Sequence, residues 1–314
     1  MALFGTDGIR GLANGETLTA EIAVDVAVAA AHILVESSAN KRPVAIVGQD
    51  SRASGEFLEA AVAAGLASAG VDVLRVGILP TPAIAYLVAQ TGADLGVMIS
   101  ASHNPMPDNG IKLFSRGGGK LDDAIEAAIE KRMGEPWTRP TGRNVGRITF
   151  DEGASARYLS HLLASVSAPL KGLKLVVDCA NGASSHVAPA AYEKAGAQVI
   201  AIHHSPDGWN INENCGSTHL EDLQAAVVKE GADFGIAHDG DADRCFLVDE
   251  KGELVNPSAL TSLIATRELA KHPGSTIIYN LISSKAVREI VEENGGTAVR
   301  SRVGHSYIKA LMSE

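Results

Sequence analysis

The feature that most constrains the fold is a strand–helix–strand pattern that occurs three times along the chain. In each case an apolar run, a polar turn, a helical stretch and a second apolar run follow one another, and the three cases cover residues 44–77, 175–202 and 276–304. Such βαβ units build parallel sheets. The repetition therefore predicts an α/β protein of tandem related domains, with mixed, mainly parallel sheets sandwiched by helices.

A second repeat marks two loops as equivalent. A similar predicted strand occurs twice, as GADLGVMIS at residues 92–100 and as GADFGIAHD at 231–239, and each copy leads into a loop. Aligning the two copies places Ser102 opposite Asp241. Because ligands in open α/β sheets bind at the carboxyl ends of the strands, we expect these loops to face one another across a cleft and to carry the function.

The length and the breaks in pattern predict three domains. A chain of 314 residues is too long for one ordinary domain. Residues 131–151 mix Pro, Gly and Arg and interrupt the helical periodicity, and the hairpin-like FLVDEKGELV ends just before Asn256. We therefore predict domains over residues 1–151, 152–256 and 257–314. The third stops one helix after its second strand, so we expect it to be incomplete.

Composition excludes several classes of protein. The formal net charge is -10 and Lys and Arg do not cluster, which argues against a nucleic-acid partner. The start of the chain has no signal-peptide pattern and no apolar run is long enough to span a membrane. Cys179, Cys215 and Cys245 are an odd number without a C-x-x-C pair, which favours structural thiols. We expect a cytoplasmic protein that does not bind membranes.

The first loop, ISASHNPMPDNGIKLF, offers a candidate nucleophile. Ser102 lies between an apolar strand and two prolines, with His103 beside it and Lys112 after a tight turn. A serine nucleophile needs a fixed backbone and neighbours that manage its proton and charge, and these residues meet that need. A Ser-His dipeptide alone is common in proteins that do no such chemistry.

The second loop, HDGDADRC, offers a candidate metal site. Asp239, Asp241 and Asp243 alternate within one short turn, and carboxylates crowded in this way repel one another unless a hard cation lies among them. Mg²⁺ suits three aspartates with an open side for phosphate oxygens, which Arg244 is placed to bind. An EF-hand fits poorly, because Arg244 stands where its loop requires Gly. A solvated acidic turn is the plain alternative.

Taken in order, FGTDGIRG, ISASHNP, GIKLF and HDGDADR resemble the motifs of the α-D-phosphohexomutase superfamily over essentially the whole chain. Within it, NINENCGSTHL and the first two motifs resemble the phosphoglucosamine mutase branch. The resemblance implies an enzyme that interconverts glucosamine-6-phosphate and glucosamine-1-phosphate through a phosphoserine and a bisphosphate intermediate. It also implies a bound Mg²⁺ and glucose or glucosamine bisphosphate as the phosphorylating activator.

The resemblance also assigns roles to residues. It implies a phosphoserine at Ser102 that contacts a Mg²⁺ held by the three aspartates, with Arg244 and Arg10 assisting the transfer. Lys112 is the candidate general acid or base, and His103 is a second one. VGHSYIKALM resembles the phosphomannomutase and phosphoglucomutase relatives instead, with His305 as a substrate-binding residue. Those enzymes are therefore the alternative assignment.

Two motifs of the superfamily are not found in the sequence: the G-E-x-S-G-H loop that reads the sugar and the R-x-S-G-T-E-P loop of a fourth domain. We therefore expect slow turnover by this chain alone, in a monomer or homodimer that binds a small sugar phosphate. Two other functions stay open. A non-catalytic module would bind Mg²⁺ or sugar phosphate without phosphorylating Ser102, and a phosphatase would release free phosphate from it.

Overall fold

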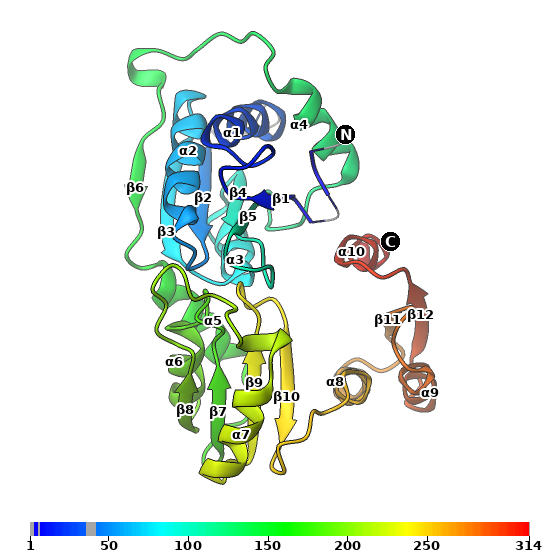
Figure 1. The fold of residues 1–314 in the computed structure, drawn as a ribbon. Helices are drawn as coiled ribbons and strands as arrows, with labels where there is room; N and C mark the ends of the chain where they lie inside the picture. Colours follow the sequence, from blue (N-terminus) through cyan, green and yellow to red (C-terminus); the bar gives the residue numbers. More distant parts are fainter. Residues whose placement is uncertain (1–2, 6, 36–41, 314) are drawn as a thin grey trace.

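The computed structural model of the chain describes residues 3–5, 7–35 and 42–313 (Figure 1). It contains three sheets that follow one another in chain order, as the repeats predicted. Each predicted βαβ unit is present and its two strands are parallel. The units are β2 (Val44–Gln49), α2 (Ser54–Ser68) and β3 (Asp72–Ile78); β7 (Lys174–Asp178), α6 (Val187–Lys194) and β8 (Gln198–Ile202); and β11 (Thr276–Asn280), α9 (Lys285–Glu293) and β12 (Thr297–Ser301).

The first sheet has six strands in the order β1-β5-β4-β2-β3-β6. Its inner strands β4, β2 and β3 run parallel, whereas β5 is antiparallel to both β4 and β1. The remaining elements of this unit are β1 (Ile9–Leu12), β4 (Leu95–Ile99), β5 (Asp108–Ser115), β6 (Ile148–Phe150), α1 (Ala20–Val35), α3 (Thr81–Thr91), α4 (Asp123–Arg132) and the 3-10 turn η1 (Gly142–Asn144).

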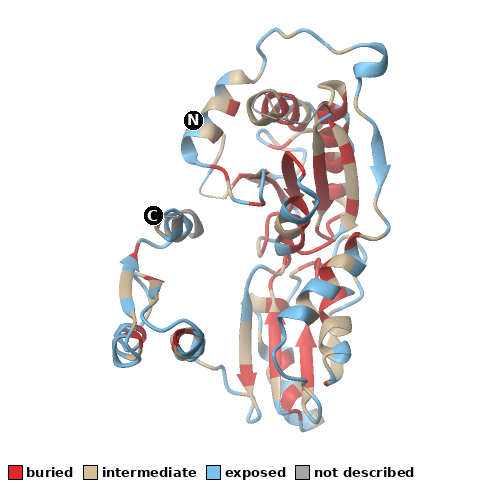
Figure 2. Cartoon of the chain, turned by 180° about the vertical axis from the view of Figure 1, so that it is seen from behind, coloured by how far each residue is buried: buried red, intermediate tan, exposed pale blue. Residues whose placement is uncertain are grey.

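Alternation along the strands divides the core of this unit into two halves. In β2, Ala45 and Val47 face a cluster that includes α1, α2 and α4, while Ile46 faces a cluster that includes α3 and Tyr158 of α5 (Ala154–Ser165). Successive side chains of a strand point to opposite faces, so a fully apolar strand must be covered on both sides. Figure 2 shows these inner strands as largely buried.

The second sheet repeats the arrangement on a smaller scale. Its order is β10-β9-β7-β8, with β9 (Phe234–His238) parallel to β7 and β10 (Cys245–Asp249) antiparallel to β9. Helix α6 covers one face, and α7 (Glu221–Glu230) covers the other. Strand β9 thus has the same neighbours as β4: a parallel central strand on one side and an antiparallel strand on the other. The short turn η2 (Gly216–Thr218) precedes α7.

The third unit contains the two-stranded β11-β12 sheet with α8 (Pro257–Lys271), α9 and α10 (His305–Ser313). Its small core joins Ala265 and Leu269 of α8 to Val291 of α9. The three sheets fall within the three predicted segments, while the residues at which the domains divide stay a prediction. None of the helices in the described ranges combines the length and apolar character needed to cross a membrane.

The boundary segment predicted at residues 131–151 contains a strand of the first sheet. Residues 148–150 of this segment form β6, which pairs with β3 in parallel. A strand of three exposed residues has no periodic signature, because its side chains are not sorted between core and solvent. Its place in the sheet comes from its backbone hydrogen bonds.

Candidate active site

The two predicted loops meet where the first and second units join. The Ser102 loop follows β4 and the acidic loop follows β9, so both leave the carboxyl ends of equivalent strands. Asp241 is tied to the start of α3 by two hydrogen bonds, from Thr81 N to Asp241 O at 2.9 Å and from Thr81 Oγ1 to Asp241 Oδ2 at 2.5 Å. The cleft predicted between the loops is a direct polar contact in this structure.

Ser102 lies at the centre of this contact and is fully buried. Its hydroxyl donates to Asp239 Oδ2 at 2.6 Å and accepts a hydrogen bond from Nη2 of Arg244. Its backbone has φ 53°, in the left-handed region that a residue with a β-carbon rarely adopts. An outlier of this kind at the end of a buried strand is typical of a residue held in a set orientation by its surroundings.

The acidic residues form the cluster that their spacing predicted. One carboxylate oxygen from each of Asp239, Asp241 and Asp243 lies within 4.8 Å of the other two. Asp239 and Asp241 are fully buried, whereas Asp243 is exposed. Ala242, between Asp241 and Asp243, has φ 52°, and this left-handed turn of the backbone brings the carboxylates of the loop together. Asp241 Oδ1 is buried and accepts no hydrogen bond from any residue that the structure describes, and a buried acceptor without a partner is costly.

The cluster has the chemistry of a site for a hard cation. Burial and the charges of Asp241 and Asp243 raise the pKa of Asp239 to about 7. Burial also acts to raise the pKa of Asp241, but Lys112 and Thr81 outweigh it and lower that pKa. A cation among these carboxylates would relieve the repulsion and give the orphaned Asp241 Oδ1 a partner. The residues present therefore fit Mg²⁺.

Lys112 contacts the Asp241 carboxylate through Oδ2, the oxygen opposite the unpartnered Oδ1. Its ammonium is 2.7 Å from Asp241 Oδ2, 3.0 Å from Asp7 Oδ2 and 4.0 Å from Asp243 Oδ2, and its side chain is only 4% exposed. Burial alone would lower the pKa of Lys112, but the charges of Asp241 and Asp7 raise it. Lys112 is consequently held as a cation. Arg10 completes this group through a 2.9 Å ion pair with Asp7.

The remaining predicted residues divide into two kinds. His103 Nδ1 lies 2.5 Å from Nη2 of Arg244 and 3.5 Å from Ser102 Oγ. Burial and the nearby charges of Arg244 and Arg10 lower the pKa of His103, which favours the neutral imidazole. Arg244 also contacts Asp239 and Asp243, at 3.0 and 3.3 Å. His305 begins α10, but its side chain lies outside the part that the structure describes.

Several residues at the site were not predicted from the sequence. Arg52 and Asn212 donate hydrogen bonds to backbone carbonyls of the Ser102 loop, and Asp7 pairs with Lys112. A signal was present for each: Asp7 lies in FGTDGIRG, Asn212 lies in NINENCGSTHL, and Arg52 follows the carboxyl end of an apolar strand. Only the structure shows what these side chains contact.

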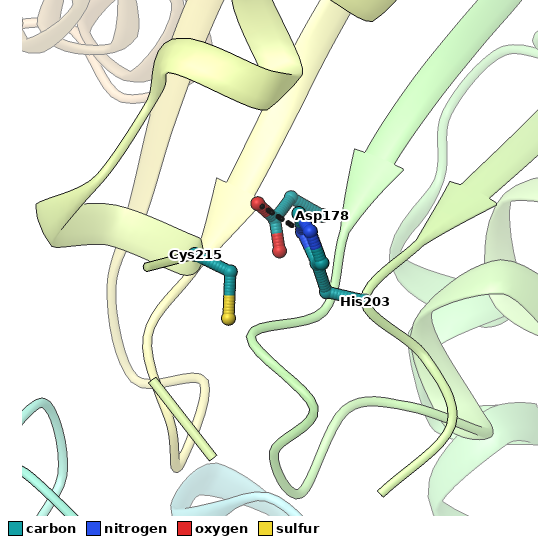
Figure 3. A group of neighbouring side chains, drawn as sticks. All are labelled: Asp178, His203 and Cys215. Carbon is teal, nitrogen blue, oxygen red and sulfur yellow. Dashed lines mark hydrogen bonds and ion pairs between the residues drawn. The ribbon is translucent and has the colours of Figure 1, made fainter. Parts of the chain in front are cut away.

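A second group of side chains is close enough to hold a metal ion in principle. Figure 3 shows Asp178, His203 and Cys215 at the carboxyl edge of the second sheet, with ligand atoms within 4.8 Å of one another. Their hydrogen bonds point to a structural clamp. His203 Nδ1 is 3.0 Å from Asp178 Oδ2, and the Asp178 carboxylate also accepts hydrogen bonds from the amides of Ala180 and Gly216. Burial raises the pKa of the Cys215 thiol to about 12, which opposes its use as a thiolate ligand.

Comparison with known proteins gives the family. The chain matches the models of phosphoglucomutase/phosphomannomutase alpha/beta/alpha domain I over residues 1–138, domain II over 156–252 and domain III over 256–314. It is 56% identical over 310 residues to a phosphoglucosamine mutase of Rhodococcus erythropolis, covering 98% of this chain and 69% of that protein. A phosphoglucosamine mutase of Acidothermus cellulolyticus is 55% identical, with 99% of this chain and 68% of the relative covered.

Solved structures agree with this result. A phosphoglucomutase/phosphomannomutase family protein from Burkholderia thailandensis superposes with a TM-score of 0.86 at 28% identity, covering 99% of this chain and 68% of the other. An N-acetylphosphoglucosamine mutase of Aspergillus fumigatus, solved with GlcNAc-6P and magnesium, has a TM-score of 0.57 at 16% identity over 98% of this chain and 64% of its own, and shows the shared fold alone. The chain therefore belongs to the phosphoglucomutase/phosphomannomutase family, as a phosphohexomutase of the phosphoglucosamine mutase group.

Proposed function

We propose that this enzyme interconverts glucosamine-6-phosphate and glucosamine-1-phosphate through a phosphorylated Ser102. The observation that carries the proposal is the buried contact between the Ser102 hydroxyl and the acidic cluster, at 2.6 Å from Asp239. Two loops from different units converge on one oxygen atom there, with a guanidinium beside it. The choice of amino sugar rests on the phosphoglucosamine mutases to which the chain is more than half identical.

In this mechanism Ser102 Oγ carries a phosphoryl group and gives it to a free hydroxyl of the sugar monophosphate. The bond between Oγ and phosphorus breaks and a bond from the sugar oxygen to phosphorus forms. The sugar hydroxyl loses a proton to a general base, and the released serine oxygen takes up a proton from a general acid to become a hydroxyl. The bisphosphate then reorients in the site, so that its other phosphate faces Ser102 and is transferred back to it. Phosphoryl transfer needs mainly positioning and neutralisation of charge, which the surrounding cations supply.

Asp239, Asp241 and Asp243 would hold the Mg²⁺. When bound, it neutralises charge on the phosphate oxygens and so makes the phosphorus easier to attack. Support comes from the distances within the cluster and the unpartnered oxygen of Asp241. Arg244, which donates to Ser102 Oγ, would bind the phosphate through its planar guanidinium.

Charge states divide the proton transfers between Lys112 and His103. The charges of its carboxylate partners raise the pKa of Lys112 and keep it protonated, so it would act mainly as a fixed positive charge beside the phosphate. It is also the candidate general acid that would return a proton to Ser102 Oγ. The lowered pKa of His103 favours the neutral ring, which can accept the proton of the attacking sugar hydroxyl. Arg10 would assist phosphate binding, and its ion pair with Asp7 orients it. His305 stays our candidate for contact with the sugar.

Three further points belong to the proposal. Glucose or glucosamine bisphosphate would phosphorylate Ser102 at the start of the cycle. We place the enzyme in the cytoplasm, since its three cysteines are free thiols suited to a reducing compartment. We expect a monomer or a homodimer.

The test follows the phosphate on Ser102. The purified chain is incubated with glucose-1,6-bisphosphate and Mg²⁺ and its intact mass is measured, with Ser102→Ala as the control. We expect one added phosphate on the wild type and none on the variant, and its loss when glucosamine-6-phosphate is added, with formation of a hexosamine bisphosphate. Release of inorganic phosphate instead would identify a phosphatase, and a wild type that never gains mass would overturn the proposal.

A further inference from the structure

Two backbone carbonyls of the Ser102 loop are each held by two side chains from outside the loop. Nη2 of Arg52 donates to Ser102 O at 3.2 Å and to Asn104 O at 2.6 Å. Nδ2 of Asn212 donates to the same two oxygens, at 2.9 and 3.0 Å. Arg52 comes from the first unit and Asn212 from the second, 110 residues away from Ser102. The loop that carries the nucleophile is thus gripped from both sides of the interface.

This grip bears on the orientation of the nucleophile. With φ at 53°, Ser102 would relax to an extended or helical backbone if nothing held it, and its hydroxyl would then turn away from Asp239. The hydrogen bonds to the Ser102 and Asn104 carbonyls oppose that rotation directly, because they hold the peptide that follows Ser102. The peptide that precedes Ser102 is held as well, since Ser102 N donates to Ser100 Oγ at 2.9 Å.

Arg52 belongs to a buried network that the first unit completes by itself. Its guanidinium forms an ion pair with Asp50, and both side chains are fully buried. Asp50 also accepts a hydrogen bond from Ser100 Oγ at 2.5 Å. This network explains how the first unit shapes its loop, but it offers a poor test. Substitution of Arg52 would leave the Asp50 carboxylate buried without its partner, and that threatens the fold itself.

Asn212 is delivered by a loop of the second unit that is tied down at both ends. His203, at the start of this loop, contacts Asp178 Oδ2 at 3.0 Å (Figure 3), and the amide of Gly216, at its end, contacts the same oxygen at 2.9 Å. Asn212 N also donates to Ala180 O at 2.9 Å. The clamp around Asp178 therefore has a consequence at a distance: it sets where the amide group of Asn212 lies relative to Ser102.

We infer that Asn212 is a positioning residue for phosphoryl transfer, which holds the Ser102 loop in its reactive conformation from the neighbouring unit. This inference rests on the proposed function of Ser102. Within the described part of the chain, Asn212 makes no hydrogen bond to the Ser102 hydroxyl or to the acidic cluster, so its effect passes through the backbone of residues 102–104. The reactive orientation of the Ser102 hydroxyl would therefore depend on the docking of the second unit against the first.

The backbone at Asn212 allows a clean substitution. Its φ is 59°, a conformation that Gly and Asp tolerate as Asn does. Asn212→Gly removes the donor and keeps the backbone. Asn212→Asp keeps the size of the side chain but puts a carboxylate oxygen against the two carbonyls. Asn214 supplies the matched control, because it has φ 50°, is exposed, and its side chain makes no hydrogen bond within the described ranges.

The experiment measures kcat, KM, the melting temperature and the Mg²⁺ affinity for Asn212→Gly, Asn212→Asp, Asn214→Gly and Asn214→Asp in the full chain. A displacement of the nucleophile by about 1 Å lowers rates by on the order of a hundredfold. We expect a loss of that size in kcat and in single-turnover transfer from phosphorylated Ser102 for Asn212→Asp, and a smaller loss for Asn212→Gly. KM and Mg²⁺ affinity should stay within about twofold of wild type, and the Asn214 variants should match wild type throughout.

The outcomes separate the two proposals. A wild type that carries no phosphate on Ser102 would sink the proposed function. A phosphorylated wild type whose Asn212→Gly variant transfers phosphate at the wild-type rate would overturn the positioning role and leave the function standing. Should Asn212→Asp fail to fold, Asn212→Gly decides the question alone. A Gly variant that loses Mg²⁺ affinity in proportion to its rate would show a general structural role and would equally refute the inference.

Discussion

Replacing Lys112 by Met tests whether one buried carboxylate serves both a lysine and a metal ion. Lys112 is 4% exposed and its ammonium is 2.7 Å from Asp241 Oδ2, while the other oxygen of Asp241 has no hydrogen-bond partner among the described residues. Met has a similar length and no charge. In the metal-free variant, Asp241 Oδ2 would lose its ammonium partner and keep the hydrogen bond from Thr81, whereas Asp7 would retain its ion pair with Arg10.

The magnitude follows from these contacts. Removing one partner of a buried ion pair costs about 3–5 kcal/mol of unfolding free energy. We expect about 3 kcal/mol for Lys112→Met without metal, at the low end of that range, since Asp7 is not left alone. With saturating Mg²⁺ the loss should fall to about 1 kcal/mol, because the cation then compensates the charge of Asp241. A difference of about 2 kcal/mol requires that the variant bind Mg²⁺ about thirtyfold more tightly than wild type.

The assay is urea unfolding in EDTA and in Mg²⁺, with the Mg²⁺ affinity measured independently by calorimetry. Lys120→Met is the matched control: Lys120 pairs with Glu126 at 3.4 Å, and both side chains are less than a tenth exposed. Its loss of stability should be the same in both solutions. An equal loss in the two solutions for Lys112→Met, or weaker binding of Mg²⁺, would refute the idea that the lysine and the metal share Asp241.

Three further predictions follow from the same geometry. Because burial and its acidic neighbours raise the pKa of Asp239 to about 7, Mg²⁺ affinity should rise with pH through about 7 and binding should release a proton, as calorimetry in buffers of different ionisation enthalpy would detect. The hydrogen bond to Asp178 raises the pKa of His203, so the stabilisation it provides is complete below the unfolded pKa and is lost as pH rises through the folded one. His203→Gln should therefore be less stable than wild type by urea unfolding at pH 5.5 and closer to it at pH 8.5. Thr81→Val removes a 2.5 Å donor to a buried carboxylate and should cost about 1.5–3 kcal/mol in the same assay, and a smaller loss in Mg²⁺ than in EDTA would agree with the cation at Asp241.

Local patterns were enough to predict the architecture. The βαβ units are visible as runs of apolar residues whose spacing changes from that of a strand to that of a helix. The duplicated GAD-x-G strand predicted that β4 and β9 would lie in equivalent places. The pairing of Ser102 with the acidic loop followed from that symmetry together with the rule that ligands bind at the carboxyl ends of strands. Repetition turned a weak local signal into a prediction about two sites far apart in the chain.

The supporting residues could not be predicted in this way. Arg52 and Asn212 act on carbonyl oxygens, and every residue has one, so the identity of the acceptor leaves no mark in the sequence. Asn212 is also 110 residues from its target and lies in a loop without periodicity. Its left-handed backbone conformation is a property of the folded loop that the sequence does not specify.

The interface between the first two units differs from an ordinary domain contact because buried polar groups of each unit find their hydrogen-bond and ion-pair partners in the other unit. Asp241 of the second unit takes its cation and its hydroxyl donor from the first, and Ser102 of the first takes an acceptor and a backbone clamp from the second. Groups that are buried and hydrogen-bonded in this way cost about 1–3 kcal/mol each when their partners are withdrawn. Separating the units would therefore expose or orphan the very groups that define the site, and docking of the two units and assembly of the nucleophile with its metal cluster are one event.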